Sequence, residues 1–149
     1  MPTTHVRSAD LEGSASGRWL LYDASQFVLG RLAAQIAMNL MGKDRPTYTA
    51  SELNGAMVVV VNAEKVRTTG KKAAQKTYAH YTGYPGGRKE VAYEDLSARR
   101  PTEIVRLAVK RMLPKSTLGT HMLKRMRVYA GPDHPHIAQK PVQVETIRS

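Results

Sequence analysis

Residues 19–61 contain the patterns from which the core of the fold can be predicted, and they read WLLYDASQFVLGRLAAQIAMNLMGKDRPTYTASELNGAMVVVV. The first four residues are apolar and predict a short strand. Apolar residues then recur at helical spacing, which predicts an amphipathic helix over 29–40 with Ser25 as its N-cap and Gly42 at its end. These residues are Leu29, Leu32, Ala33, Ile36, Ala37 and Leu40.

The run of four valines within residues 57–61 predicts a second strand, buried on both faces of a parallel sheet. A strand, a helix and a strand in this order predict an α/β unit with a right-handed crossover. The core of the fold is therefore expected to be a small parallel sheet covered by helices.

The rest of the chain is expected to complete this single domain over residues 18–149. Residues 66–89 lose helical periodicity and predict short strand pieces around a long basic loop. A helix is expected from Pro101, with Ile104, Val105, Ala108 and Met112 on its apolar side. A shorter helix should place Met122, Leu123 and Met126 inward and His121, Lys124 and Arg125 outward, before a last strand at 128–130 and a loop at 132–141. The polar residues 1–17 are expected to form a flexible arm.

Several function classes are disfavoured by composition. The chain of 149 residues has no cysteine, which excludes disulfides, thiolate nucleophiles and cysteine-ligated zinc. Its five histidines lack the spacing of a metal site, so no metal is predicted. The longest apolar run is far shorter than the roughly 20 residues that cross a bilayer, so no membrane span is expected.

The alternative hypothesis is a nucleotide-dependent enzyme built on the same α/β core. The glycine-rich segment 82–89 could indicate such an enzyme, because glycine-rich loops bind nucleotide phosphates. A Walker loop requires G-x-x-x-x-G-K-[ST], but Arg88 stands at the second glycine position and no hydroxyl residue follows Lys89. The segment 69–72 fails in the same way, because Lys72 takes the hydroxyl position. We therefore predict no enzyme, no cofactor and no small-molecule substrate.

The charge is strongly asymmetric along the chain. The protein carries 23 Lys and Arg against 12 Asp and Glu, a net charge of +11. Residues 1–64 hold five basic and six acidic residues, so the whole excess lies in residues 65–149. Blocks of one sign favour a polyanionic partner over an evenly basic, solvated surface. Because Trp19 and Phe27 lie in the half without this excess, nucleic acid is favoured over a membrane surface.

The residue types in the basic half favour RNA over DNA. Glycines allow close backbone approach, Lys and Arg neutralise phosphates, and tyrosines offer ring faces to unpaired bases. Each tyrosine could instead be a core aromatic, and each cation an ordinary solvated charge. The candidate RNA-binding residues from this pattern are Lys71, Lys72, Tyr78, His80, Tyr84, Gly86, Gly87, Arg88, Lys89, Arg99, Arg100, Lys110, Lys124, Arg125 and Arg127.

A series of short motifs, in order over roughly residues 18–144, resembles the large-subunit ribosomal protein L13 family in its bacterial and organellar form. They are Leu29-Gly30-Arg31-Leu32-Ala33, Val59-Val60-Val61-Asn62-Ala63-Glu64-Lys65-Val66, Thr69-Gly70-Lys71-Lys72, Thr82-Gly83-Tyr84 with Gly86-Gly87, Arg99-Arg100-Pro101, Met112-Leu113-Pro114-Lys115, Val128-Tyr129-Ala130-Gly131, and His134-Pro135-His136 with Ala138-Gln139-Lys140-Pro141. Their order and spacing carry the resemblance; each motif alone is weak.

The resemblance implies a three-layer α/β/α domain that binds large-subunit ribosomal RNA early in subunit assembly, beside neighbouring ribosomal proteins. It implies a place on a cytoplasmic ribosome, with an organellar ribosome as the alternative. Carried over by position, it adds Lys115, His134 and His136 to the candidate residues and supports Lys71, Lys72, Tyr84, Gly86, Gly87, Arg99 and Arg100. The chain departs from the family pattern at Ala56, Arg111, Ser116 and Thr120-His121, so contacts at those positions are not carried over.

Overall fold

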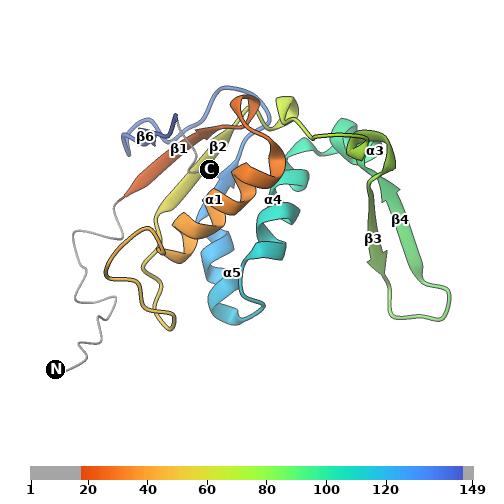
Figure 1. The fold of residues 1–149 in the computed structure, drawn as a ribbon, viewed down its shortest axis with the longest axis horizontal. Helices are drawn as coiled ribbons and strands as arrows, with labels where there is room; N and C mark the ends of the chain where they lie inside the picture. Colours follow the sequence, from red (N-terminus) through yellow and green to blue (C-terminus); the bar gives the residue numbers. More distant parts are fainter. Residues whose placement is uncertain (1–17, 146–149) are drawn as a thin grey trace.

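The computed structural model describes residues 18–145 (Figure 1). The flexible N-terminal segment expected at residues 1–17 lies outside this range. The strand β1 (Trp19–Asp23), the helix α1 (Leu29–Met41) and the strand β2 (Met57–Val61) form the predicted unit, with β1 and β2 parallel. The helix ends at Gly42, whose φ of 78° is the left-handed conformation expected of a C-terminal glycine. The strand–helix–strand prediction is confirmed.

The prediction that Ser25 caps α1 is wrong. A 3-10 turn, η2 (Ala24–Gln26), precedes the helix, and the N-cap of α1 is Val28. The carboxylate of Asp23 accepts hydrogen bonds from the backbone N–H and the hydroxyl of Ser25, at 3.0 and 2.7 Å. Because Asp23 caps its own short turn first, the chain enters α1 three residues later than a Ser25 cap would require.

Four parallel strands form the main sheet, in the order β5-β2-β1-β6. The strand β5 is Met126–Val128, two residues earlier than predicted, and β6 (Val142–Gln143) was not predicted. The small parallel sheet and the α/β class are confirmed. All four residues of Val58–Val61 are buried, as the valine run predicted for a strand covered on both faces.

Helices α1, α4 (Pro101–Met112) and α5 (Thr117–Lys124) pack together on one face of the sheet (Figure 1). Along α4, Ile104, Val105 and Val109 are fully buried, whereas Met112 is 44% exposed. The prediction for Met112 was therefore wrong: Val109 continues the buried face, and Met112 is the last residue of the helix. In α5, Met122 is buried as predicted.

The opposite face of the sheet meets a loop in the described part of the chain. The ring of His136 lies 5.0 Å from the ring of Trp19, and the Tyr129 hydroxyl lies 2.9 Å from His136 Nε2. Over residues 18–145, the third layer that the resemblance implied is therefore a loop, the segment around 129–136, and not a helix. Helical periodicity is missing in this segment, and prolines interrupt it.

Residues 63–99, which follow β2 and precede α4 in the chain, form a projecting segment that we call the arm (Figure 1). A 3-10 turn, η3 (Ala63–Lys65), and a single helical turn, α2 (Lys72–Gln75), lead into an antiparallel hairpin of β3 (Thr77–Tyr81) and β4 (Arg88–Ala92). The hairpin is followed by α3 (Tyr93–Arg99). The expected strand pieces are confirmed, but α2 and α3 were not predicted because neither carries a long apolar stripe: Tyr93 is the buried residue of α3.

Candidate nucleic-acid interface

A cleft of about 810 Å³ opens where the arm joins the body of the fold. It lies between the first turn of α1, residues 68–76 and the C-terminal half of α4. Four of its lining residues are cations and none is acidic: Arg31, Lys72, Lys76 and Arg111. Its apolar lining comes from Val28, Leu29, Ala108 and Met112. The cleft therefore combines a concentrated positive field with apolar surface.

The first turn of α1 adds to this positive field. The turn holds no acidic residue, and no side chain caps its amides. The backbone N–H of Leu29 is satisfied by the carbonyl of Arg67, at 2.9 Å, which ties the helix to the edge of the arm. The N-terminal amides of a helix carry partial positive charge and favour anions. The helix start thus has the same sign as the four cations.

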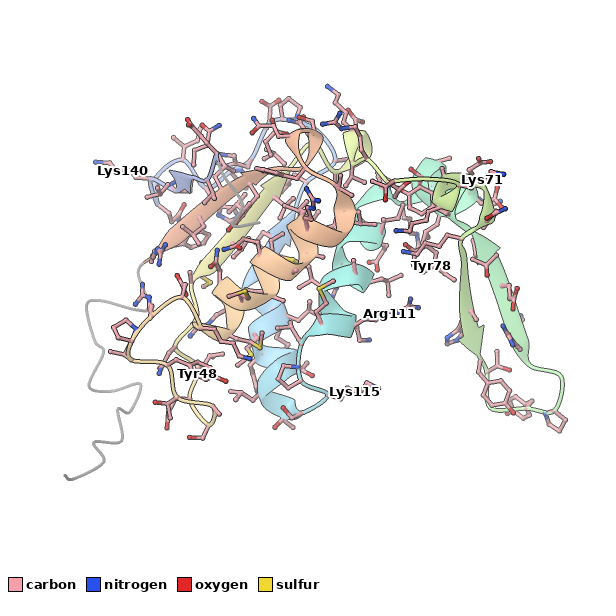
Figure 2. All side chains as sticks on the ribbon, viewed as in Figure 1. Tyr48, Lys71, Tyr78, Arg111, Lys115 and Lys140 are labelled. Atoms are coloured by element: carbon pink, nitrogen blue, oxygen red, sulfur yellow. The ribbon has the colours of Figure 1, made fainter. Side chains whose placement is uncertain are left out.

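Tyr78 closes one side of the cleft and is buried, so of the two alternatives left open by the sequence it is a core aromatic and not an exposed ring. Its ring is only 7% exposed and packs 6.5 Å from the ring of Tyr93, so it is not a free platform for bases. Lys76 Nζ lies 5.1 Å and Arg111 Cζ 5.5 Å from the ring centre, within range of cation–π attraction. Figure 2 labels Tyr78 and Arg111. Burial raises the pKa of Tyr78, and the positive charge of Arg111 opposes that rise.

The hairpin carries six of the other predicted residues, namely His80, Tyr84, Gly86, Gly87, Arg88 and Lys89. His80 is paired with Lys89 and Tyr81 with Arg88 across the two strands. At the tip, Tyr84 and Tyr81 are 75% and 62% exposed. Exposed rings beside cations are suited to unpaired bases and phosphates.

Two of the three glycines at the hairpin tip, Gly86 and Gly87, have structural tasks. Gly86 has a φ of 71°, a conformation that other residues rarely adopt. Gly87 donates to the carbonyl of Tyr84 at 2.9 Å and accepts from the N–H of Thr82 at 3.1 Å, and a Cβ there would overlap the Thr82 hydroxyl. The turn geometry therefore accounts for both glycines, whatever the tip contacts.

The remaining predicted cations lie on the arm and around α4 and α5. Lys71, Arg99 and Arg100 are exposed on the arm or at its junction with α4. Lys110 and Lys115 line a hollow of about 460 Å³ between α4 and α5. Lys124 and Arg127 line another of about 500 Å³ beside β5.

Arg125 does not point outward as predicted. Its guanidinium donates to the carbonyl oxygen of Gly55 at 2.6 Å, and its burial lowers its pKa. The contact joins the end of α5 to the loop that leads into β2. Arg125 therefore stabilises the fold, because a half-buried cation needs an acceptor.

His134 and His136 lie away from the cleft, in the loop over the sheet. His134 Nδ1 accepts from the backbone N–H of His136 at 3.2 Å, and His136 meets Tyr129 and Trp19 as described above. In residues 18–145, no group of three or more His, Asp or Glu side chains could hold a metal ion. Within the same range, none of the helices is both long and apolar enough to cross a membrane.

Three of the cleft's four cations were not predicted from the sequence, namely Arg31, Lys76 and Arg111. Lys76 follows the basic run at Lys71 and Lys72, so its position in the sequence was a usable signal. Arg31 and Arg111 are 80 positions apart and belong to different helices. Only the packing of α1 beside α4 brings them together.

The fold and the charge distribution define the chain as a basic α/β protein whose cationic surface suits a polyanion. The family model for ribosomal protein L13 matches residues 17–135, and the chain belongs to that family. It is 50% identical to the large ribosomal subunit protein uL13 of Chloroflexus aggregans over 141 residues, 95% of this chain and 96% of that one. It is 53% identical to uL13 of Thermus thermophilus over 128 residues, 86% of this chain and 91% of that one.

Proposed function

We propose that this chain is a structural component of the large ribosomal subunit, which binds large-subunit ribosomal RNA and supports early subunit assembly. Its work is binding rather than catalysis. Its partners are the ribosomal RNA and neighbouring large-subunit proteins, on a cytoplasmic ribosome or an organellar one. The observation that carries the proposal is the pairing of family membership with a cleft of four cations and no lining carboxylate.

The proposed RNA-binding surface extends from the cleft along the arm. The cleft supplies Arg31, Lys72, Lys76 and Arg111, and the hairpin supplies His80, Tyr84, Arg88 and Lys89. Further proposed contacts are Lys71, Gly86, Gly87, Arg99, Arg100, Lys110, Lys115, Lys124, Arg127, His134 and His136. Each phosphate neutralised by a cation releases counterions, so such a surface binds RNA with a strong dependence on salt.

The test is a titration of large-subunit ribosomal RNA with the full chain at several salt concentrations. We expect log K to fall steeply with log salt, by roughly 0.7 to 0.9 per phosphate contact. The variant Arg88→Ala/Lys89→Ala should flatten that slope by up to about two units, one per lost contact.

The matched control removes the same charge elsewhere. Lys43→Ala/Lys65→Ala lies outside the proposed contacts and should leave the slope close to that of the native chain. A flat salt response of the native chain would overturn the proposal. Saturable ATP or GTP binding that the hairpin variant abolishes, with RNA affinity unchanged, would favour the nucleotide-dependent enzyme instead.

A further inference from the structure

We propose that the cleft between α1, residues 68–76 and α4 holds one unstacked nucleotide of a single-stranded RNA segment. The phosphate meets the cations, and the base lies against the apolar lining. This inference rests on the proposed function and deepens it, because it specifies which form of RNA one part of the surface recognises.

The charges of the cleft call for an anion. Arg31, Lys72, Lys76 and Arg111 come from three separate parts of the fold, and none of them forms an ion pair with a carboxylate of residues 18–145. Like charges brought together repel one another unless a counter-charge binds between them. A phosphate group supplies that charge, and the forked guanidinium groups of Arg31 and Arg111 match its oxygens.

Tyr78 is the independent sign that the cleft is built for a ligand. Its side chain is more than nine-tenths buried and lines the cleft, yet its hydroxyl has no hydrogen-bond partner within the described chain. A buried hydroxyl without a partner costs free energy. Lys76 and Arg111 lie over its ring, and their long side chains can turn toward a bound phosphate. The proposed nucleotide supplies the partner that this hydroxyl lacks.

The size and lining of the cleft favour a nucleotide over a bare phosphate. Its volume of about 810 Å³ is in the range of small-molecule sites. Val28, Leu29, Ala108 and Met112 give it apolar surface that a phosphate would leave uncovered and that the face of a base would cover. A base in a duplex is stacked between its neighbours and cannot enter, so the cleft selects single-stranded RNA.

The experiment titrates isotope-labelled full-length protein with adenosine monophosphate and, separately, with inorganic phosphate, following backbone amide signals by NMR. We expect saturable shifts at Gly30, Arg31 and Thr69 with the nucleotide. Arg111→Gln should weaken the nucleotide at least about fivefold, because it removes a charge-assisted contact. Arg106→Gln, on the same helix but outside the cleft lining, removes the same charge and should leave the affinity unchanged.

Tyr78→Phe separates a binding role from a structural one. Removal of a buried hydroxyl that has no partner should leave the melting temperature unchanged or raise it. The same variant should weaken the nucleotide about threefold or more. Unchanged affinity in this variant would overturn the role of Tyr78 in binding.

The other outcomes distinguish this inference from the proposed function. Equal affinity for phosphate and nucleotide would overturn the part played by the base. Absence of shifts at the cleft, in protein that still binds ribosomal RNA with a steep salt slope, would overturn the nucleotide site and leave the proposed function standing. In a competition experiment, we expect a single-stranded RNA hexanucleotide to displace the bound nucleotide and a blunt RNA duplex to leave it bound. Equal displacement by the two would overturn the selectivity for single-stranded RNA.

Discussion

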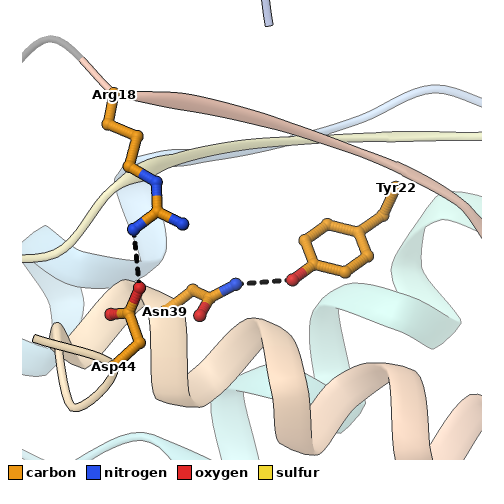
Figure 3. Close-up of polar contacts among 4 residues, drawn as sticks. All are labelled: Arg18, Tyr22, Asn39 and Asp44. Carbon is orange, nitrogen blue, oxygen red and sulfur yellow. Dashed lines mark hydrogen bonds and ion pairs between the residues drawn. The ribbon is translucent and has the colours of Figure 1, made fainter. Parts of the chain in front are cut away.

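The hydroxyl of Tyr22 on β1 accepts a hydrogen bond of 2.5 Å from the side-chain amide of Asn39 on α1 (Figure 3). Both residues are buried, at 0% and 4% exposure, so the bond crosses the interface between sheet and helix away from water. Burial raises the pKa of Tyr22 to about 12, because the buried site disfavours the charged phenolate. Nearby, Arg18 and Asp44 form an ion pair of 2.7 Å at the exposed edge of the same interface.

Removal of the Tyr22 hydroxyl should therefore destabilise the fold. In Tyr22→Phe, the buried amide of Asn39 loses its acceptor, and we expect a loss of about 1–3 kcal/mol in the free energy of unfolding. The control is Tyr48→Phe, because Tyr48 is 39% exposed and its hydroxyl can meet water. Urea denaturation at neutral pH measures both, and equal midpoints for the two variants would contradict the prediction.

The carboxylate of Asp23 should make stability depend on acid. Burial by itself would raise its pKa, but hydrogen bonds from Asn62 and Ser25 outweigh burial, so the pKa lies below its usual value of 3.8. A lowered folded-state pKa gives stability that is present above the unfolded-state value and is lost as the pH falls through the folded-state value. Asp23→Asn should thus be less stable than the native chain at neutral pH.

The difference between Asp23→Asn and the native chain should shrink as the pH falls below about 4. Asp133→Asn, in an exposed loop, is the control and should match the native chain throughout. Thermal melts over a pH series measure the difference. A gap that stayed constant down to pH 2 would show that the charge of Asp23 contributes nothing.

A charge placed on the buried stripe of α1 should unfold the protein or nearly so. Ile36 is fully buried, and Ile36→Asp should cost several kcal/mol, the scale of an unpaired buried charge. The sequence alone suggests Gln35→Asp as the mild control, but Gln35 is half-buried. Ala34 is exposed on the same helix, so Ala34→Asp is the better control. Similar melting temperatures for the two variants would refute the stripe.

Gly55 should tolerate no side chain. A Cβ at this position would overlap the carbonyl oxygen of Leu40 near the end of α1, and backbone cannot move aside as a flexible side chain can. We expect Gly55→Ala to lose roughly 2–4 kcal/mol of stability, the scale of overpacking with backbone strain. A Cβ at Gly131 meets nothing within 4 Å, so Gly131→Ala should be nearly neutral. Chemical denaturation compares the two, and a neutral Gly55→Ala would contradict the close packing of this loop on α1.

Local patterns in the sequence were enough for the framework of the fold. The apolar spacing of Leu29 to Leu40 and the valine run of β2 each lie within one element, so backbone periodicity alone determines which faces are buried. The charge asymmetry is likewise a property of the chain, and it indicates a polyanionic partner without reference to the fold. The helix α4 was less predictable in detail, because Val109 and Met112 both fit an apolar face and only packing separates them.

Tertiary structure alone decided which cations and rings act together. Tyr78 and Arg125 looked like exposed RNA contacts, but Tyr78 packs on Tyr93 at the side of the cleft, and Arg125 donates to the carbonyl oxygen of Gly55. Arg31 and Arg111 meet at one cleft because α1 packs against α4. The physical reason is that the periodicity of one element specifies its own faces, whereas a contact between distant residues depends on how several elements pack at once.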